Sequence, residues 1–283
     1  MAGGPYTNEA GRVLSKFELL VNLLAAAGIP WFPLPMSALL SRPILVISPH
    51  LDDAVLSCGG LLLQNSDALV VTVFTADPPM PRVKPLDAWA TPKMRRAEDA
   101  AAMERVGAKA RLLNKLDAID RVGTEGERLY SRIEALFGVV ARADAPLRDQ
   151  IVEGVLPHIE ERLVLCPMAV GAHVDHQLCA HAGRKLQTLG HNVLFYEDAP
   201  YVYPNPGKAV QSDSVLRAAG RLRARVEGFE DVAIDDITKS QAVACYATQV
   251  RELFGDMASY SVSIQGHFEA LEGEIERFYH LRF

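Results

Sequence analysis

The chain has 283 residues, of which 49% are hydrophobic and 23% are charged, and its formal net charge at pH 7 is -6. This composition excludes a disordered chain and is sufficient for one α/β domain with a large buried core. The acidic balance argues against a nucleic-acid partner, because phosphate binding requires a concentrated basic face.

Residues 1–42 are predicted to form a helix and a proline-rich linker that pack on the core. The apolar residues of 17–28 recur at helical spacing. A signal peptide is the alternative interpretation of this segment, but Glu18 and Asn22 interrupt its apolar run. The run is too short to span a bilayer, so we expect an amphipathic helix and no membrane span.

Four cysteines lie far apart, at Cys58, Cys166, Cys179 and Cys245, without a Cys-x-x-Cys pair. Separated cysteines of this kind are typical of reduced, buried thiols rather than of a disulfide scaffold. We therefore expect a cytoplasmic protein.

Short apolar strands then alternate with helical stretches. Strands are expected at 44–48, 68–75, 110–114, 162–167 and 192–196, and helices after the first strand and at 94–106, 130–141, 148–160 and 176–189. This alternation predicts an α/β fold with a mainly parallel sheet, whose ligands bind beyond the carboxyl ends of the strands.

Residues 204–283 are expected to extend the same domain. The pattern predicts helices at 211–227 and 238–253, a short strand at 231–234, and helical structure from Glu269 to Phe283. The aromatic residues of the last stretch predict packing on the core, with a subunit contact as the alternative.

Ionisable side chains gather at two of the predicted strand ends. The first strand runs into His50, Asp52 and Asp53. If the chain turns into a helix there, positions three apart share one face, so His50 and Asp53 could hold one ion.

The second group follows the predicted strand 162–167. It comprises His173, Asp175 and His176, with the two imidazoles again three residues apart. One histidine or aspartate beside a strand is usually a helix cap or a surface residue. Six in two short windows are hard to explain as caps, because burying them unpaired is costly. The joint pattern predicts an open catalytic metal site of nitrogen and oxygen ligands.

At these residues the chain resembles the PIG-L/LmbE-like family of zinc-dependent N-deacetylases. The family's first motif, Pro/Ala-His-Pro-Asp-Asp-Glu, corresponds to residues 49–54, with Leu51 and Ala54 as departures. Its second motif, His-x-Asp-His, matches residues 173–176 fully. The resemblance spans roughly residues 43–203 and implies a Rossmann-like three-layer sandwich for this catalytic core.

The resemblance also implies a role for each motif residue. The metal ligands would be His50, Asp53 and His176, holding Zn²⁺ or another divalent ion. Asp52 would be the general base. His173 would stabilise the oxyanion and protonate the leaving amine, with Asp175 orienting it.

Substrate contacts are expected from two further segments that resemble the family. Arg95 lies in an Arg-x-x-Glu helix, for which a solvated ion pair is the alternative interpretation. Glu197, Asp198 and Tyr201 lie in a Glu-Asp-x-Pro-Tyr segment similar to that of antibiotic-pathway members. Whether His267 completes the cleft stays open at this point.

The resemblance implies a small-molecule substrate with an N-acylated amino sugar. The expected reaction removes an acetyl group from an N-acetylglucosamine-type sugar, on a secondary-metabolite glycoside such as a glycopeptide pseudoaglycone or an aminoglycoside precursor. The alternatives are a metal-dependent amidase of a thiol conjugate and a non-catalytic sugar-binding protein of the same fold. Retention of Asp52 argues against the latter, because binding alone needs no base. The oligomeric state stays open.

Overall fold

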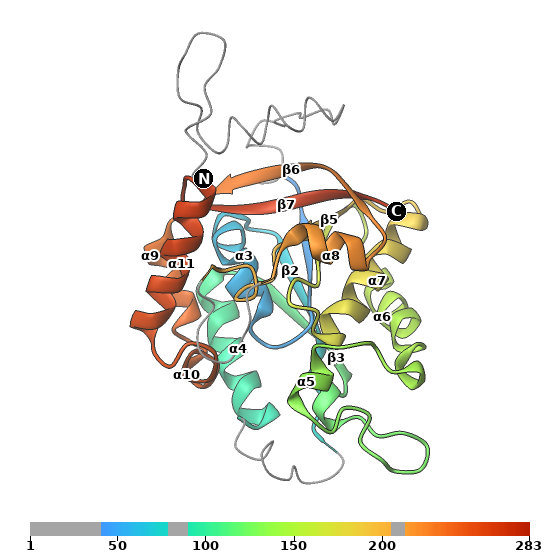
Figure 1. The fold of residues 1–283 in the computed structure, drawn as a ribbon. Helices are drawn as coiled ribbons and strands as arrows, with labels where there is room; N and C mark the ends of the chain where they lie inside the picture. Colours follow the sequence, from blue (N-terminus) through green and yellow to red (C-terminus); the bar gives the residue numbers. More distant parts are fainter. Residues whose placement is uncertain (1–40, 79–89, 205–212) are drawn as a thin grey trace, which may run out of the picture.

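The computed structural model describes residues 41–78, 90–204 and 213–283. The expected N-terminal helix and proline-rich linker lie outside the described residues. A seven-stranded sheet of order β3-β2-β1-β4-β5-β7-β6 forms the centre of the described part (Figure 1). Its strands are β1 (Ile44–Ser48), β2 (Ala68–Phe74), β3 (Lys109–Lys115), β4 (Leu163–Pro167), β5 (Val193–Tyr196), β6 (Arg225–Ala233) and β7 (Ile275–Arg282).

Strands β1 to β5 pair in parallel, whereas β7 runs antiparallel to both β5 and β6. Every residue of β1, β2, β4 and β5 is buried, which explains their continuous apolar sequences, since both faces of the sheet are covered. The predicted α/β fold with a mainly parallel sheet is confirmed.

Helices cover the two faces of the sheet (Figure 1). One face holds α3 (Asp53–Gln64), α4 (Pro92–Val106), α9 (Asp236–Val243), α10 (Ala247–Leu253) and α11 (Met257–Leu271). The other holds α6 (Leu147–Val155), α7 (Val174–Thr188) and α8 (Val215–Arg221). Alternate strand residues enter the two cores, so that Ile44 and Val46 face the first and Leu45 and Ile47 the second.

The helix expected at 130–141 is wrong over most of its length, because only α5 (Ile133–Leu136) is helical. Tyr130 instead anchors an irregular segment. Its hydroxyl donates to Asp144 at 2.7 Å and accepts from the backbone N–H of Ala141 at 2.8 Å. These two bonds tie the start of the segment to its far end at residues 141–144.

The C-terminal expectations also need correction. The helix expected at 211–227 ends at Arg221, and Arg223 adopts a left-handed φ of 55° before β6 begins. The helix expected at 238–253 is two helices, α9 and α10. The last stretch is helical only to Leu271 and then forms β7, whose Phe278, Tyr279 and Leu281 are buried. The terminal aromatics therefore pack on the core, as expected.

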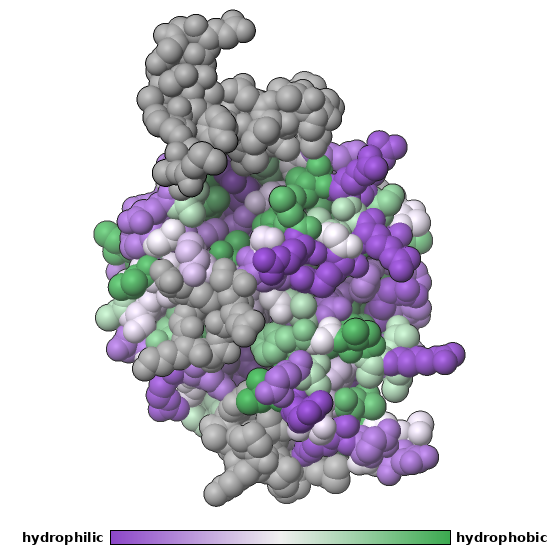
Figure 2. Space-filling view, viewed as in Figure 1, coloured by the Kyte–Doolittle hydropathy of each residue, from purple (hydrophilic) through white to green (hydrophobic). Residues whose placement is uncertain are grey.

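Hydrophilic and hydrophobic side chains are interspersed on the face shown in Figure 2, with hydrophilic ones over α8. Within the described ranges, no helix is both long and apolar enough to cross a membrane.

Candidate active site

The first motif forms the turn between β1 and α3. The Ser48 hydroxyl donates to the carbonyl of His50 at 2.6 Å and accepts from the N–H of Ala54 at 3.1 Å. The N–H of His50 donates to Asp53 Oδ2 at 2.7 Å. This turn therefore places the side chains of His50 and Asp53 on one side, as the spacing predicts.

The second motif forms the N-terminus of α7. His173 is the N-cap, and its Nδ1 accepts a hydrogen bond from the N–H of Asp175 at 3.3 Å. An accepting Nδ1 carries no proton, so the neutral ring bears its proton on Nε2. Asp175 and His176 lie in the first turn of the helix and are both buried.

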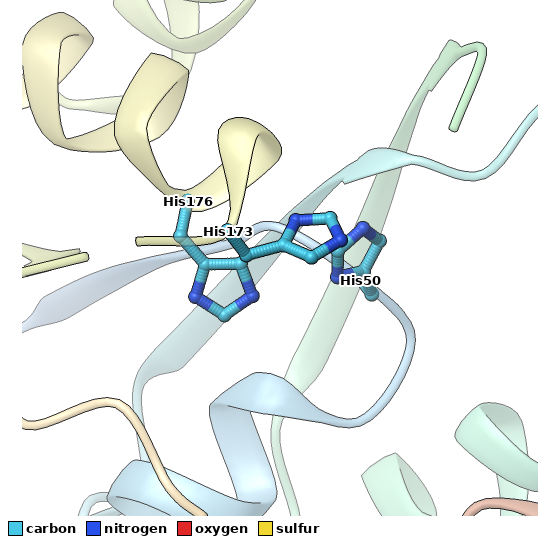
Figure 3. Close-up of side chains that lie close together, drawn as sticks. All are labelled: His50, His173 and His176. Atoms are coloured by element: carbon cyan, nitrogen blue, oxygen red, sulfur yellow. The ribbon is translucent and has the colours of Figure 1, made fainter. Parts of the chain in front are cut away.

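The two motifs meet at the carboxyl ends of β1 and β4. Asp53 Oδ2 lies 3.2 Å from His50 Nδ1 and 3.4 Å from His176 Nε2. The ring centroids of His50 and His176 are 5.4 Å apart, and that of His173 is 5.0 Å from His50. Figure 3 shows the three imidazoles gathered between the loop after β1 and the start of α7.

Two overlapping sets of donor atoms in this cluster are close enough to share an ion. One comprises His50, His173 and His176, and the other comprises His50, Asp117 and Asp175. All five residues are buried. The cluster thus offers imidazole and carboxylate groups to a divalent metal from more than one side.

Carboxylates surround both imidazoles and favour positive charge there. Burial alone would lower the pKa of His50, but Asp175, Asp53 and Asp117 raise it well above its ordinary value. Burial likewise opposes the charged form of His176, yet Asp53 and Asp198 raise its pKa to about 9. A site that attracts protons this strongly is also suited to a metal cation.

Asp198 lies behind His176 and not in the wall of the cavity. Its carboxylate is fully buried, 2.7 Å from His176 Nδ1, and it accepts from the N–H of Val170 at 2.9 Å. The expectation that Asp198 contacts substrate therefore disagrees with the geometry. The bond to Nδ1 leaves Nε2 of His176 to face Asp53, which is an orienting role.

Glu197 does not line the cavity either. Tyr279 donates to its Oε1 at 2.5 Å, and His267 Nε2 lies 3.1 Å from its Oε2. Both partners come from the C-terminal elements α11 and β7. The segment that carries Asp198 is thus fixed from behind, and His267 supports that segment rather than completing the cleft.

The carboxylate of Asp175 contacts His50, whereas His173 receives only the backbone N–H of Asp175, which corrects the expected orienting pair. Its Oδ2 lies 3.1 Å from His50 Nε2, and its Oδ1 lies 2.6 Å from Nη1 of Arg121. The reason is the helix turn itself, in which His173 uses its ring to cap the backbone. Burial lowers the pKa of His173 well below its ordinary value, so its ring is neutral rather than protonated.

Asp52 faces a cavity of about 390 Å³ beside the cluster. Its Oδ1 accepts from Nη2 of Arg95 at 3.2 Å. Burial raises the pKa of Asp52, and Arg95 opposes this effect. Tyr201, as well as Arg95, lines the cavity, where both were expected to contact substrate.

Asp117 and Arg121 were missed by the sequence reasoning. Asp117 Oδ2 lies 3.9 Å from both His50 Nε2 and Arg95 Nη1, and Arg121 pairs with Asp175 and Asp144. Asp117 comes two residues after the end of β3, so the strand-end criterion that found His50 could have found it. Arg121 follows a short 3-10 turn, η2 (Ala118–Asp120), and no sequence pattern marks it.

A buried cluster of imidazoles and carboxylates, open to a cavity at the carboxyl ends of a parallel sheet, is the arrangement of a hydrolytic enzyme of α/β fold that can hold a divalent metal. Comparison with known families identifies the family within this class. The chain belongs to the PIG-L family, because residues 45–187 match the family model described as GlcNAc-PI de-N-acetylase. The N-deacetylase class predicted from the two motifs is confirmed.

Two relatives share the name 2'-N-acetylparomamine deacetylase. That of Niallia circulans is 29% identical over 261 residues, which cover 80% of this chain and 87% of the relative. That of Streptomyces fradiae is 33% identical over 205 residues, or 63% of each chain.

Solved structures of two deacetylases are also similar. The A40926 pseudoaglycone deacetylase is 27% identical with a TM-score of 0.65, covering 85% of this chain and 97% of that one. The zinc-inhibited form of teicoplanin deacetylase is 25% identical with a TM-score of 0.68, covering 84% of this chain and 97% of that one.

Proposed function

We propose that the protein hydrolyses the N-acetyl group of an N-acetylglucosamine-type sugar on a secondary-metabolite glycoside. The relatives that act on N-acetylparomamine and on glycopeptide pseudoaglycones support this substrate class. The observation that carries the proposal is the position of Asp53 Oδ2 between His50 and His176, beside a cavity that Asp52 lines.

Zinc is the metal that we propose for this site. Two imidazoles and one carboxylate form a donor set typical of catalytic zinc, and Asp198 behind His176 is the usual outer support. His50, Asp53 and His176 would hold the ion. When bound, zinc supplies Lewis-acid polarisation of the amide carbonyl and makes water a stronger acid.

Asp52 is the proposed general base. It lines the cavity, and its raised pKa strengthens it as a proton acceptor. Arg95 holds the carboxylate through Oδ1, so Oδ2 is left to accept the proton of the attacking water. The same proton can then pass to the nitrogen of the leaving amine, which balances the hydrolysis.

His173 is the proposed oxyanion donor. It lines the cavity as a neutral ring whose Nδ1 accepts from the backbone, so the Nε2 proton is available to the oxygen of the tetrahedral intermediate. A fixed donor aimed at developing charge stabilises the transition state more than the ground state.

The test is the Asp52→Ala variant, assayed for both zinc content and acetate release from 2'-N-acetylparomamine. The Asp52 side chain makes no helix-cap hydrogen bond, so α3 should keep its structure. We expect zinc to be retained and turnover to fall about 10²–10⁴-fold.

The matched control is Asp67→Ala, an exposed carboxylate next to the amino end of β2, which should leave both readouts unchanged. Full acetate release by the Asp52 variant would refute the assignment of the base. Absence of a bound divalent ion from active wild-type protein would refute the metal site.

A further inference from the structure

The turn after β3 encloses the carboxylate of Asp175. Its Oδ2 accepts from the N–H of Ala118, at the start of η2, at 3.0 Å. Its Oδ1 lies 2.6 Å from Nη1 of Arg121, the C-cap residue of the same turn. The side chain of Asp175 is fully buried, and that of Arg121 is 6% exposed. Both oxygens of this carboxylate are therefore held by one short segment of the chain.

Contacts on its edge and on its faces fix the guanidinium of Arg121. Nε donates to Asp144 Oδ2 at 2.8 Å, and Nη1 donates to the carbonyl of Leu116 at 3.0 Å. The ring centroids of Phe74 and Tyr130 lie 5.1 Å and 5.3 Å from its central carbon. A guanidinium suits this place, because its donors point in fixed directions within a plane whose faces stack on aromatic rings. It is therefore a rigid support for the carboxylate that it meets.

The same carboxylate contacts a proposed metal ligand. Oδ2 of Asp175 lies 3.1 Å from His50 Nε2, while His50 Nδ1 lies 3.2 Å from Asp53 Oδ2. A carboxylate that engages one ring nitrogen of a histidine determines which nitrogen is left for a metal. Asp198 has the same relation to Nδ1 of His176. Each of the two imidazoles thus has its own orienting carboxylate.

A buried ion pair alone would be weak evidence for a function. Two charges removed from water lose hydration that their attraction repays only in good geometry, so such pairs often add little to stability. The contacts of Arg121, however, lead directly to the site, from the guanidinium to Asp175 and from Asp175 to His50. Arg121 does not line the active-site cavity, so any effect on the reaction must pass through these side chains.

We propose that Arg121 is a positioning residue, which holds Asp175 so that His50 is oriented to bind the metal. This inference rests on the proposed deacetylase function, which requires a divalent ion at His50, Asp53 and His176. Without the guanidinium, the Asp175 carboxylate can turn away and the imidazole loses its fixed partner. Binding then has to order the ring, which weakens the affinity for the metal.

The test measures zinc affinity by competition with a chelator. The Arg121→Gln/Asp144→Asn double variant removes the guanidinium together with the charge of its second partner, so the segment loses one positive and one negative charge. We expect its affinity for zinc to be about 10–100-fold lower than that of wild type.

Asp144→Asn alone is the matched control. It keeps a side-chain oxygen for Nε of Arg121 and leaves the contact between Arg121 and Asp175 in place, so it should keep the wild-type zinc affinity. Equal losses of affinity in the single and double variants would assign the effect to the segment as a whole and would overturn the proposal.

Arg121→Lys decides the question if the double variant fails to fold, which near-UV circular dichroism detects. Lysine keeps the positive charge but lacks the planar fork, so we expect zinc binding to be about tenfold weaker than in wild type. Wild-type zinc affinity in a folded variant of Arg121 would overturn the proposal.

Acetate release from 2'-N-acetylparomamine, measured on the same proteins, separates this role from the proposed function. If wild type releases no acetate while zinc affinity falls in the Arg121 variants as expected, the proposed function fails and the role of Arg121 stands. If wild type releases acetate while a folded Arg121 variant binds zinc as tightly as wild type, the role of Arg121 is refuted and the deacetylase function stands.

Discussion

Asp198 illustrates how one buried carboxylate can determine the geometry of a metal site. It accepts from the Val170 N–H and lies against His176 Nδ1, so it selects the ring nitrogen that faces Asp53. The acidic pair of residues 197–198 therefore supports the side chains of the site without lining its cavity. The family resemblance located this segment, but only the structure shows that Asp198 orients His176 and that neither acid lines the active-site cavity.

Asp99 gives a pH-dependent contribution to stability. It lies in α4, where Tyr246 donates to its Oδ1 at 2.7 Å, and burial raises its pKa from 3.8 to about 6. The folded state thus holds the proton more tightly than the unfolded chain. This contribution is present in full below the unfolded pKa near 3.8 and is lost as pH rises through about 6.

We therefore expect the difference in free energy of unfolding, Asp99→Asn minus wild type, to increase by about 2 kcal/mol when the pH is raised from about 4.5 to about 7.5. Urea denaturation at both pH values measures this. Asp77→Asn, at an exposed carboxylate, should follow the wild-type profile. Parallel profiles for wild type and the Asp99 variant would contradict the prediction.

At the scale of elements, a side chain from β7 stabilises α3. Helix α3 has a non-helical residue at Cys58, so a second helical start follows it. Glu276 accepts from the N–H groups of Gly60 and Leu61, both at 2.8 Å. Gly60 has no room for a side chain, because an added Cβ would overlap Ile234.

Glu276 also pairs with Lys239 at 2.8 Å, and both side chains are at most 4% exposed. Glu276→Gln should lower the free energy of unfolding by about 3–5 kcal/mol, because it leaves the Lys239 charge buried without a counter-charge. The Lys239→Met/Glu276→Gln double variant should recover part of this loss. Lys109→Met, which removes an exposed ion pair with Asp67, should cost no more than about 1 kcal/mol in the same denaturation assay. Equal losses at the two pairs would contradict the prediction that the buried pair of Glu276 and Lys239 contributes more than an exposed one.

The sequence predicts the parallel half of the sheet well, because strands covered on both faces are continuous apolar runs such as 68–74. It also predicts the two motifs, because the side chains that bind ligands in a parallel sheet gather at the carboxyl ends of the strands. It fails for β7, whose sequence Ile-Glu-Arg-Phe-Tyr-His-Leu-Arg mixes charge and aromatics. The charges of Glu276 and Arg277 are buried only because Lys239 and Asp231 meet them from distant elements, and no local pattern reveals such partners.

The same limitation applies to the site. His50 and His176 follow from short motifs, whereas the Asp175–Arg121 pair joins residues 54 positions apart through an irregular segment. The His173–Asp175 pair was expected from adjacency in sequence. The N-terminal turn of α7 instead separates those side chains and directs Asp175 to His50.

At the scale of the whole molecule, the C-terminal residues complete the sheet that the metal motifs need. Strand β7 lies between β5 and β6, and its Phe278 and Tyr279 enter opposite cores. Tyr279 also donates to Glu197, next to the carboxylate that orients His176. The two motifs thus lie in the first two thirds of the chain, whereas the packing and hydrogen bonds that hold the neighbouring strand β5 come from the C-terminal strand β7.

Truncation after Gly273 should therefore abolish both folding and zinc binding, although all proposed metal ligands remain. Burial of Phe278, Tyr279 and Leu281 contributes about 1.5–3 kcal/mol each, which together rivals the 5–15 kcal/mol stability of a typical domain. Near-UV circular dichroism and metal analysis measure the two losses. Tyr279→Phe keeps the ring and removes only the hydroxyl, so it should retain the fold at a cost of about 1–3 kcal/mol. A truncated protein with native circular dichroism and a full complement of metal would show that the family-matched region builds the site without β7.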